Sequence, residues 1–321
     1  MREFRPAWWC LNRHAQTIWG PLFRAKRVPL RRERVTMDDG DFVDLDWLDG
    51  DAPPGAPLLL VLHGLEGSSG SHYVGGLLAG ARARGWRGVV LNFRSCSGEL
   101  NRLPRFYHSG DTGDLDAIVR LLMGREPGVR FGVAGVSIGG NVLLKWLGER
   151  GGGAPAAIAG AVTISVPFDL TACAEVLDRG FAKLVYTANF MRTMRRKVLE
   201  KARAYPGFVD AAAVRRARTF AVYDSLVTAP LSGFADARDY WRRASSLPYL
   251  GAIARPTLLL NAHDDPFIPP ESLPKPQDLS PHVRLVVTPR GGHVGFVDGR
   301  WPWRADSWAE RRALDFLASV L

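Results

Sequence analysis

The chain has 321 residues, a hydrophobic content of 46% and a formal net charge of +10, from 42 lysines and arginines against 32 acidic residues. The apolar content suffices for a large buried core, and the basic residues are spread out without a long Lys/Arg run, which disfavours nucleic-acid binding. Three scattered cysteines, Cys10, Cys96 and Cys173, lack metal-binding spacing, so they argue against a disulfide scaffold and for a reducing compartment.

The N-terminal segment is irregular in pattern. MREFRPAWWCLNRH is interrupted by charges and has no apolar core region, so it is not expected to be a secretory signal. No apolar run reaches the roughly 18 residues of a transmembrane helix. These features together predict a cytoplasmic protein. Residues 1–33 lack clean periodicity and are expected to form an irregular arm packed on the domain.

The remaining chain predicts an α/β fold. Residues 34–48 alternate around a glycine turn, which is typical of a β-hairpin. Continuous apolar runs predict buried parallel strands at 58–64, 88–93, 131–136, 157–165, 256–262 and 283–289, with helices at about 72–84, 111–124, 139–149 and 307–321. This alternation predicts a single domain with a mostly parallel sheet covered by helices on both faces. Residues 166–250 interrupt it and are expected to form a helical cap.

Ser137 is the candidate nucleophile. It lies in the stretch Gly135-Val136-Ser137-Ile138-Gly139, between a predicted strand and a predicted helix. A serine on so tight a turn needs small neighbours two residues away, and the turn exposes its hydroxyl at the carboxyl end of the strand. The pattern alone is weak evidence, and a phosphate-cradling turn is the competing interpretation. The chain has neither GxxxxGK[ST] nor a GxGxxG after a strand, which disfavours that alternative.

A serine nucleophile also needs a base and an acid. His293 follows the last predicted strand in a glycine-rich loop, and Asp264 and Asp265 follow the strand before it. The order Ser137, Asp265, His293 is a known triad order, and all three follow strands at the sheet edge where α/β proteins place their sites. Asp265 is preferred because the DPFIP turn suits the acid position, with Asp264 as the alternative. The remaining histidines have no comparable role: His63 ends an early strand, His263 neighbours the acids, and the others are His14, His72, His108 and His282.

The amides of Ile138, after the nucleophile, and Leu65, after the His-Gly pair, are the expected oxyanion-hole donors. Residues 93–101 follow a strand and are expected to line the site. Cys96 within them lacks a dedicated base and is expected to be a pocket or core thiol. The basic stretch 191–203 is expected to be a solvated face of the cap, with contact to anionic lipid as the alternative.

Five stretches in chain order, 12–24, 61–77, 91–115, 135–141 and 261–296, together resemble the YheT-like branch of the α/β-hydrolase family. Its members are bacterial and yeast esterases related to the mammalian abhydrolase-domain lipid hydrolases. The resemblance implies an α/β-hydrolase fold acting on carboxylic esters, with short acyl chains or glycerolipids, and Ser137, His293 and Asp265 as the triad.

Such chemistry requires no metal or organic cofactor. The expected partner is a small-molecule or lipid ester, with peripheral membrane contact through the basic cap left open and no nucleic acid. Two alternatives remain: an acyltransferase or haloperoxidase-like enzyme on the same fold, and a non-catalytic binding or scaffold protein.

Overall fold

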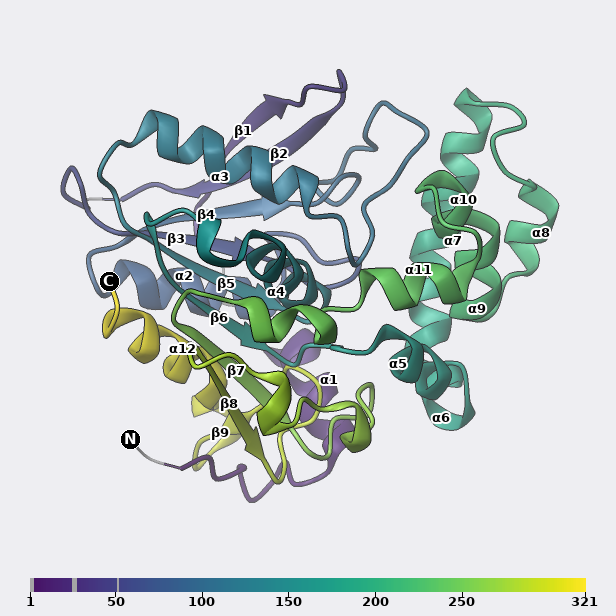
Figure 1. Ribbon diagram of the computed structural model, residues 1–321. Helices are drawn as coiled ribbons and strands as arrows, with labels where there is room; N and C mark the ends of the chain where they lie inside the picture. Colours follow the sequence, from purple (N-terminus) through teal and green to yellow (C-terminus); the bar gives the residue numbers. More distant parts are fainter. Residues whose placement is uncertain (1–2, 25–27, 51) are drawn as a thin grey trace.

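The computed structural model describes residues 3–24, 28–50 and 52–321. Its centre is an eight-stranded sheet with the order β1-β2-β4-β3-β5-β6-β7-β8. The strands are β1 (Arg31–Thr36), β2 (Phe42–Leu48), β3 (Leu58–Leu62), β4 (Arg87–Asn92), β5 (Phe131–Val136), β6 (Ile158–Ile164), β7 (Thr257–Ala262) and β8 (Val283–Thr288). Strands β3 to β8 run parallel, while β1 and β2 form an antiparallel hairpin that pairs with β4 (Figure 1). The predicted mostly parallel sheet is confirmed.

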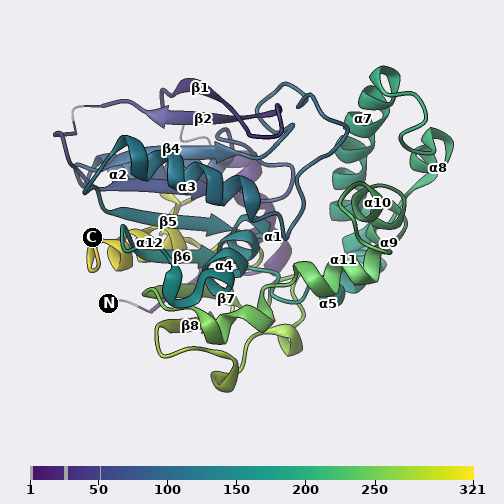
Figure 2. The ribbon, with the colours of Figure 1, turned by 45° about the horizontal axis from the view of Figure 1, so that its top comes forward.

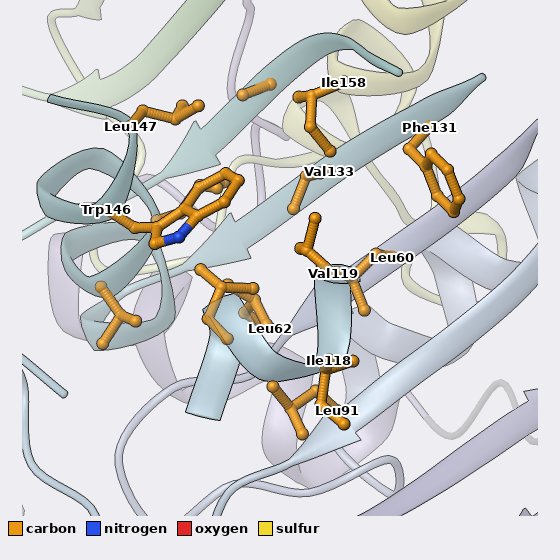
Figure 3. Packing of buried hydrophobic residues seen from close by; sticks show 14 of the residues in the cluster. Leu60, Leu62, Leu91, Ile118, Val119, Phe131, Val133, Trp146, Leu147 and Ile158 are labelled. Atoms are coloured by element: carbon orange, nitrogen blue, oxygen red, sulfur yellow. The ribbon is translucent and has the colours of Figure 1, made fainter. Parts of the chain in front are cut away.

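Helices cover both faces of this sheet because side chains of a strand alternate between the faces. In β3, Leu60 and Leu62 pack into one apolar cluster, while Leu59 and Val61 pack into the other. The first cluster lies under α3 (Gly113–Arg125) and α4 (Ile138–Arg150), and the second under α2 (His72–Arg82) and α12 (Trp308–Ala318). Figure 3 shows the first cluster, in which Trp146 of α4 and Ile118 of α3 approach the strand residues.

A block of helices separates β6 from β7. Its helices are α5 (Leu170–Leu177), α6 (Gly180–Ala182), α7 (Ala188–Ala204), α8 (Ala211–Arg216), α9 (Phe220–Tyr223), α10 (Ala229–Leu231) and α11 (Ala237–Ala244). We call residues 170–244 the helical block. Two views place it beyond the carboxyl ends of the parallel strands (Figures 1 and 2). It has an apolar core of its own, which includes Met191, Val214 and Trp241.

The N-terminal segment differs from the irregular arm expected over residues 1–33. Residues Arg13–Phe23 form helix α1, and β1 already begins at Arg31. The Asn12 side chain caps α1 by accepting hydrogen bonds from the amides of His14 and Ala15. The apolar pattern of this helix is short and ends at Pro21 and Phe23, which explains why periodicity alone did not reveal it. Residues 1–2 and 25–27 of the expected arm lie outside the described residues.

Candidate active site

Ser137 lies at the sharp turn between β5 and α4. Its backbone has φ 52° and ψ −122°, a conformation that residues other than glycine rarely adopt, so the surrounding structure must hold it in place. The Ser137 amide donates to the carbonyl oxygen of Ile164 at 2.8 Å, and the Ser137 carbonyl oxygen accepts from the amide of Gly140 at 2.9 Å. The turn places the Ser137 hydroxyl at the carboxyl edge of the sheet, beside the positive end of α4.

Two glycines make this turn possible. A Cβ on Gly135 would lie 2.7 Å from the carbonyl oxygen of Gly139, and a Cβ on Gly139 would lie 2.6 Å from the carbonyl oxygen of Leu62. Both approaches are to backbone atoms, which cannot rotate away as a side chain can. The close packing of the turn on β3 therefore excludes a side chain at either position.

His293 connects Ser137 to Asp265. Its Nε2 lies 3.0 Å from the Ser137 Oγ, and its Nδ1 lies 2.9 Å from the Asp265 Oδ2. An ionised carboxylate can only accept a hydrogen bond, so Nδ1 carries the proton and Nε2 accepts from the serine hydroxyl. The Asp265 Oδ1 accepts from the amide of Phe267 at 2.8 Å, and the Phe267 ring stacks on the imidazole at 4.1 Å between centroids. The buried imidazole thus has one fixed orientation, suited to taking a proton from Ser137.

Asp264 takes a different position from its neighbour. Its Oδ1 accepts a hydrogen bond from the amide of Gly292 at 2.9 Å, and burial raises the pKa of its carboxyl group. In the described structure its side chain forms no hydrogen bond with His293. The geometry therefore supports Asp265 as the partner of His293 and gives Asp264 a role in shaping the loop before it.

The loop that carries His293 is anchored by helix α1. The His293 amide donates to the Thr17 Oγ1 at 2.9 Å, and the Val297 amide donates to the Gln16 Oε1 at 2.6 Å. A Cβ on Gly292 would lie 2.5 Å from the carbonyl oxygen of Arg13, so the loop and the helix touch through backbone atoms. Sequence reasoning missed this contribution. The available signal was Asn12 as a helix N-cap, but no local pattern reports a partner so distant in sequence.

The candidate oxyanion donors lie on two loops beside Ser137. Leu65 and Ile138 both line the same cavity as Ser137, and no described residue accepts a hydrogen bond from either amide. A Cβ on Gly64 would lie 3.3 Å from the Ser137 Cβ, so the loop before Leu65 passes close to the serine. Both amides are therefore available to an oxygen atom bound near Ser137.

His63 shapes that loop and does not act as a base. Its Nδ1 lies 2.8 Å from the carbonyl oxygen of Gly64, and its Nε2 accepts from the amide of Phe93 at 3.1 Å. Burial lowers the pKa of His63 to about 4, so the ring is neutral near pH 7. The Tyr73 hydroxyl accepts from the amide of Gly64 at 2.7 Å. The ring and the phenol together fix the path of the chain up to Leu65.

A cavity of about 850 Å³ lies between this edge of the sheet and the helical block. Ser137, His293, Leu65 and Ile138 line it at the sheet. Most of the other lining side chains are apolar or aromatic, contributed by α1 and by the helical block, and include Ile18, Leu22, Leu170, Leu177, Phe190, Met194, Phe220, Tyr240 and Trp241. A cavity of this size and lining suits a small-molecule or lipid group of drug-like dimensions.

Some other residues singled out by the sequence lie elsewhere. Residues 93–101 are not among those that line the cavity, which corrects the expectation for this stretch; the cavity is lined instead by the loop residues Tyr107 to Ser109. Burial raises the pKa of the Cys96 thiol to about 12, so the thiol stays protonated and unreactive. Cys10, Cys96 and Cys173 are all buried and form no disulfide.

The remaining histidines are structural or peripheral. His72 and His108 line the cavity, which the sequence did not indicate, and burial lowers the pKa of His72 to about 3 and of His108 to about 4. His14 contacts the Tyr186 hydroxyl at 2.9 Å, and His263 is exposed. Among the described residues, no group of His, Cys, Asp or Glu side chains is arranged to hold a metal ion.

The basic stretch 191–203 is not a uniform solvated face. Lys201 is buried and donates to the Asn101 Oδ1 at 2.7 Å, and burial lowers the pKa of this lysine to about 8. Lys197 donates to the Glu66 Oε1 at 2.8 Å and so joins α7 to the residue after Leu65. Glu66 is itself held with φ 56°, and its amide donates to the Tyr107 hydroxyl at 2.7 Å. Two lysines of the stretch therefore fasten the helical block to the sheet domain.

Within the part of the chain that the structure describes, no helix combines the length and the apolar character needed to cross a bilayer.

Comparison with known proteins identifies relatives along nearly the whole chain. The family model described as the alpha/beta hydrolase fold matches residues 57–300. The chain is 40% identical to the esterase candidate YheT of Escherichia coli (strain K12), over 99% of this chain and 94% of that protein. It is 33% identical to the phospholipase ABHD3 of Mus musculus, over 99% of this chain and 79% of that protein.

Solved structures agree on the fold. The esterase Pf2001 of Pyrococcus furiosus superposes with a TM-score of 0.57 at 20% identity, covering 91% of this chain and 93% of that one. At this identity the match concerns the fold alone. The family model and the sequence relatives show more than a shared fold, because they match this chain in sequence over most of its length. The chain belongs to the α/β-hydrolase family, within the branch that contains YheT and the ABHD3 phospholipases.

Proposed function

We propose that the protein is a serine hydrolase that cleaves carboxylic esters through an acyl-enzyme intermediate. The observation that carries the proposal is the hydrogen-bonded series from Ser137 through His293 to Asp265, with separations of 3.0 and 2.9 Å. The names of the relatives, an esterase candidate and a phospholipase, agree with ester hydrolysis. The apolar cavity beside Ser137 suits short acyl esters or glycerolipid esters.

The first step acylates the enzyme. The Ser137 Oγ attacks the ester carbonyl carbon while His293 Nε2 takes the serine proton, and Asp265 stabilises the resulting imidazolium. The carbonyl oxygen becomes an oxyanion that accepts hydrogen bonds from the amides of Leu65 and Ile138. The bond from the carbonyl carbon to the alcohol oxygen then breaks, and His293 returns its proton to the leaving alcohol.

The second step releases the acid. A water molecule gives a proton to His293 and attacks the acyl carbon, and the tetrahedral intermediate again places its negative oxygen at the amides of Leu65 and Ile138. Ser137 leaves with the proton from His293. The helical block acts as a cap that excludes bulk water from the cavity and shapes the space for the substrate.

The test is a panel of p-nitrophenyl esters graded by acyl length, with Ser137→Ala as control. The wild-type protein is expected to hydrolyse some of them, and Ser137→Ala is expected to lose this activity while keeping its melting temperature. A fluorophosphonate probe should label Ser137 in the wild-type protein. Wild-type turnover in Ser137→Ala would show that Ser137 is not the nucleophile. A wild-type protein that neither hydrolyses any ester nor takes up the probe would be non-catalytic. Added alcohols as acceptors separate hydrolysis from acyl transfer.

A further inference from the structure

The cavity reaches the surface between α1 and the beginning of the helical block. Its lining includes Asp224 and Trp241, which are buried, and also Leu22 of α1, which is 65% exposed. Val185 also lines the cavity and is exposed, and it belongs to the π-helical segment η2 (Lys183–Thr187). The mouth of the cavity is therefore bordered by the last turn of α1 on one side and by η2 on the other.

Large apolar side chains surround this mouth and face solvent. We call them the mouth patch: Leu22, Phe23, Phe181, Leu184 and Val185. The two sides of the patch meet at the mouth, because Leu22 and Val185 are both exposed and both line the same cavity. The segment of Phe181 also contacts α1, since the Phe181 ring centroid lies 4.6 Å from that of His14 at the start of this helix. Leu184 is 76% exposed, although a side chain of this kind is normally buried. Contiguous exposed apolar side chains of this kind mark an interaction surface.

The segment that carries three of the five patch residues is also basic. Residues 175–196 contain five basic side chains and two acidic ones, Glu175 and Asp178. Asp178 is occupied within the block, because its carboxylate accepts hydrogen bonds from the amides of Phe220 and Ala221. Arg179 and Arg192 are exposed, and neither forms an ion pair with any described residue. The surface beside the mouth thus combines apolar side chains with unpaired positive charge.

We propose that the mouth patch docks the protein on the surface of an anionic lipid bilayer, with the cavity opening toward the lipid. Apolar side chains that enter the interfacial region, flanked by arginines that meet anionic headgroups, are the features of peripheral membrane binding. A second copy of this chain fits less well, because a symmetric contact would bring the unpaired arginines of both copies together. The proposal goes beyond the proposed function, since docking requires no turnover.

The test is flotation with large unilamellar vesicles of phosphatidylcholine and phosphatidylglycerol in equal parts, compared with vesicles of phosphatidylcholine alone. The wild-type protein is expected to float with the anionic vesicles and to dissociate as salt is raised. The variant Phe23→Asp/Leu184→Asp is expected to partition roughly a hundredfold more weakly, about tenfold for each apolar side chain lost from the interface. Neither residue lines the cavity, so hydrolysis of a soluble short-chain ester should be unchanged.

Two further variants control for charge. Val287→Asp adds one negative charge, as each single substitution of the double variant does, at an exposed apolar side chain of the edge strand β8, outside the mouth patch, and should float like the wild type. Arg179→Gln/Arg192→Gln should weaken binding to the anionic vesicles by roughly thirtyfold, with little effect on the neutral ones.

Several outcomes would overturn the proposal. They are the absence of wild-type flotation, equal flotation of the wild type and Phe23→Asp/Leu184→Asp, or an equal loss in Val287→Asp. A wild-type dimer that Phe23→Asp/Leu184→Asp dissociates, without vesicle binding, would instead assign the patch to a second copy. Ser137→Ala should float like the wild type, so the docking result stands apart from the outcome of the ester assays.

Discussion

Replacing Asp265 by asparagine tests the orientation of His293 with little change in shape. The asparagine would place its amide, a donor, against the His293 Nδ1, which lies 2.9 Å from the Asp265 Oδ2. Nδ1 must then accept, so the proton moves to Nε2, which faces the Ser137 Oγ at 3.0 Å. In that tautomer the imidazole cannot take the serine proton. The side-chain oxygen of asparagine can still accept from the amide of Phe267, so the turn is expected to survive.

The expected loss for Asp265→Asn is roughly 10³- to 10⁴-fold in kcat, by analogy with the same tautomer change in serine proteases. This corresponds to about 4 to 5 kcal/mol of transition-state stabilisation. The matched control is Asp264→Asn, because Asp264 bonds the amide of Gly292 and not His293. Its carbonyl oxygen can keep that bond, so kcat should fall by less than about tenfold.

The assay is steady-state hydrolysis of a soluble p-nitrophenyl ester, with melting temperatures measured in parallel. Comparable activity for Asp265→Asn and the wild type would refute the tautomer argument. A large loss for Asp264→Asn with a small one for Asp265→Asn would exchange the roles of the two acids.

Two further predictions concern the loop from His63 to Glu66, which passes beside Ser137. Lys197→Met leaves the nearly buried carboxylate of Glu66 without its cation, which is expected to lower the free energy of urea unfolding by roughly 3 kcal/mol. Because Glu66 follows the proposed donor Leu65, kcat is also expected to fall by about tenfold. Stability should recover in Glu66→Gln/Lys197→Met, and a Lys197→Met protein with wild-type stability and kcat would contradict the prediction. Burial lowers the pKa of His63 from about 6.5 to about 4, so the unfolded chain binds a proton at this group more readily than the folded protein does. The neutral ring therefore contributes its full stability above pH 6.5, and this contribution is lost as the pH falls toward 4. His63→Asn should flatten this acid dependence of urea unfolding by about 3 kcal/mol, and an unchanged acid dependence in this variant would contradict the prediction.

The sequence predicted the sheet well because its signal is local. The apolar run 131–136 coincides with β5, since every side chain of a central parallel strand is buried. The run 58–64 was predicted too long, because β3 ends at Leu62. His63 and Gly64 look like a continuation of the run, but their hydrogen bonds turn the chain out of the sheet.

The candidate site could be predicted only in part. Ser137, Asp265 and His293 each follow a strand, and the parallel sheet brings the ends of those strands to one edge. The choice between Asp264 and Asp265 depends on which carboxylate faces the imidazole of His293. Neighbouring residues of a turn point their side chains in different directions, so the sequence alone does not decide between them. The cavity and the anchoring by α1 depend on side chains from distant segments, so no pattern within a short stretch reports them.

The contact between α1 and the loop of His293 also has a consequence for the order in which the chain folds during synthesis. Thr17 and His293 are separated by 276 positions, yet the histidine amide bonds the threonine hydroxyl. On the ribosome α1 emerges early, but its contact with the loop of His293 can form only when nearly all the remaining chain has been made. The proposed base His293 therefore takes its final position only after two segments from opposite ends of the chain have met.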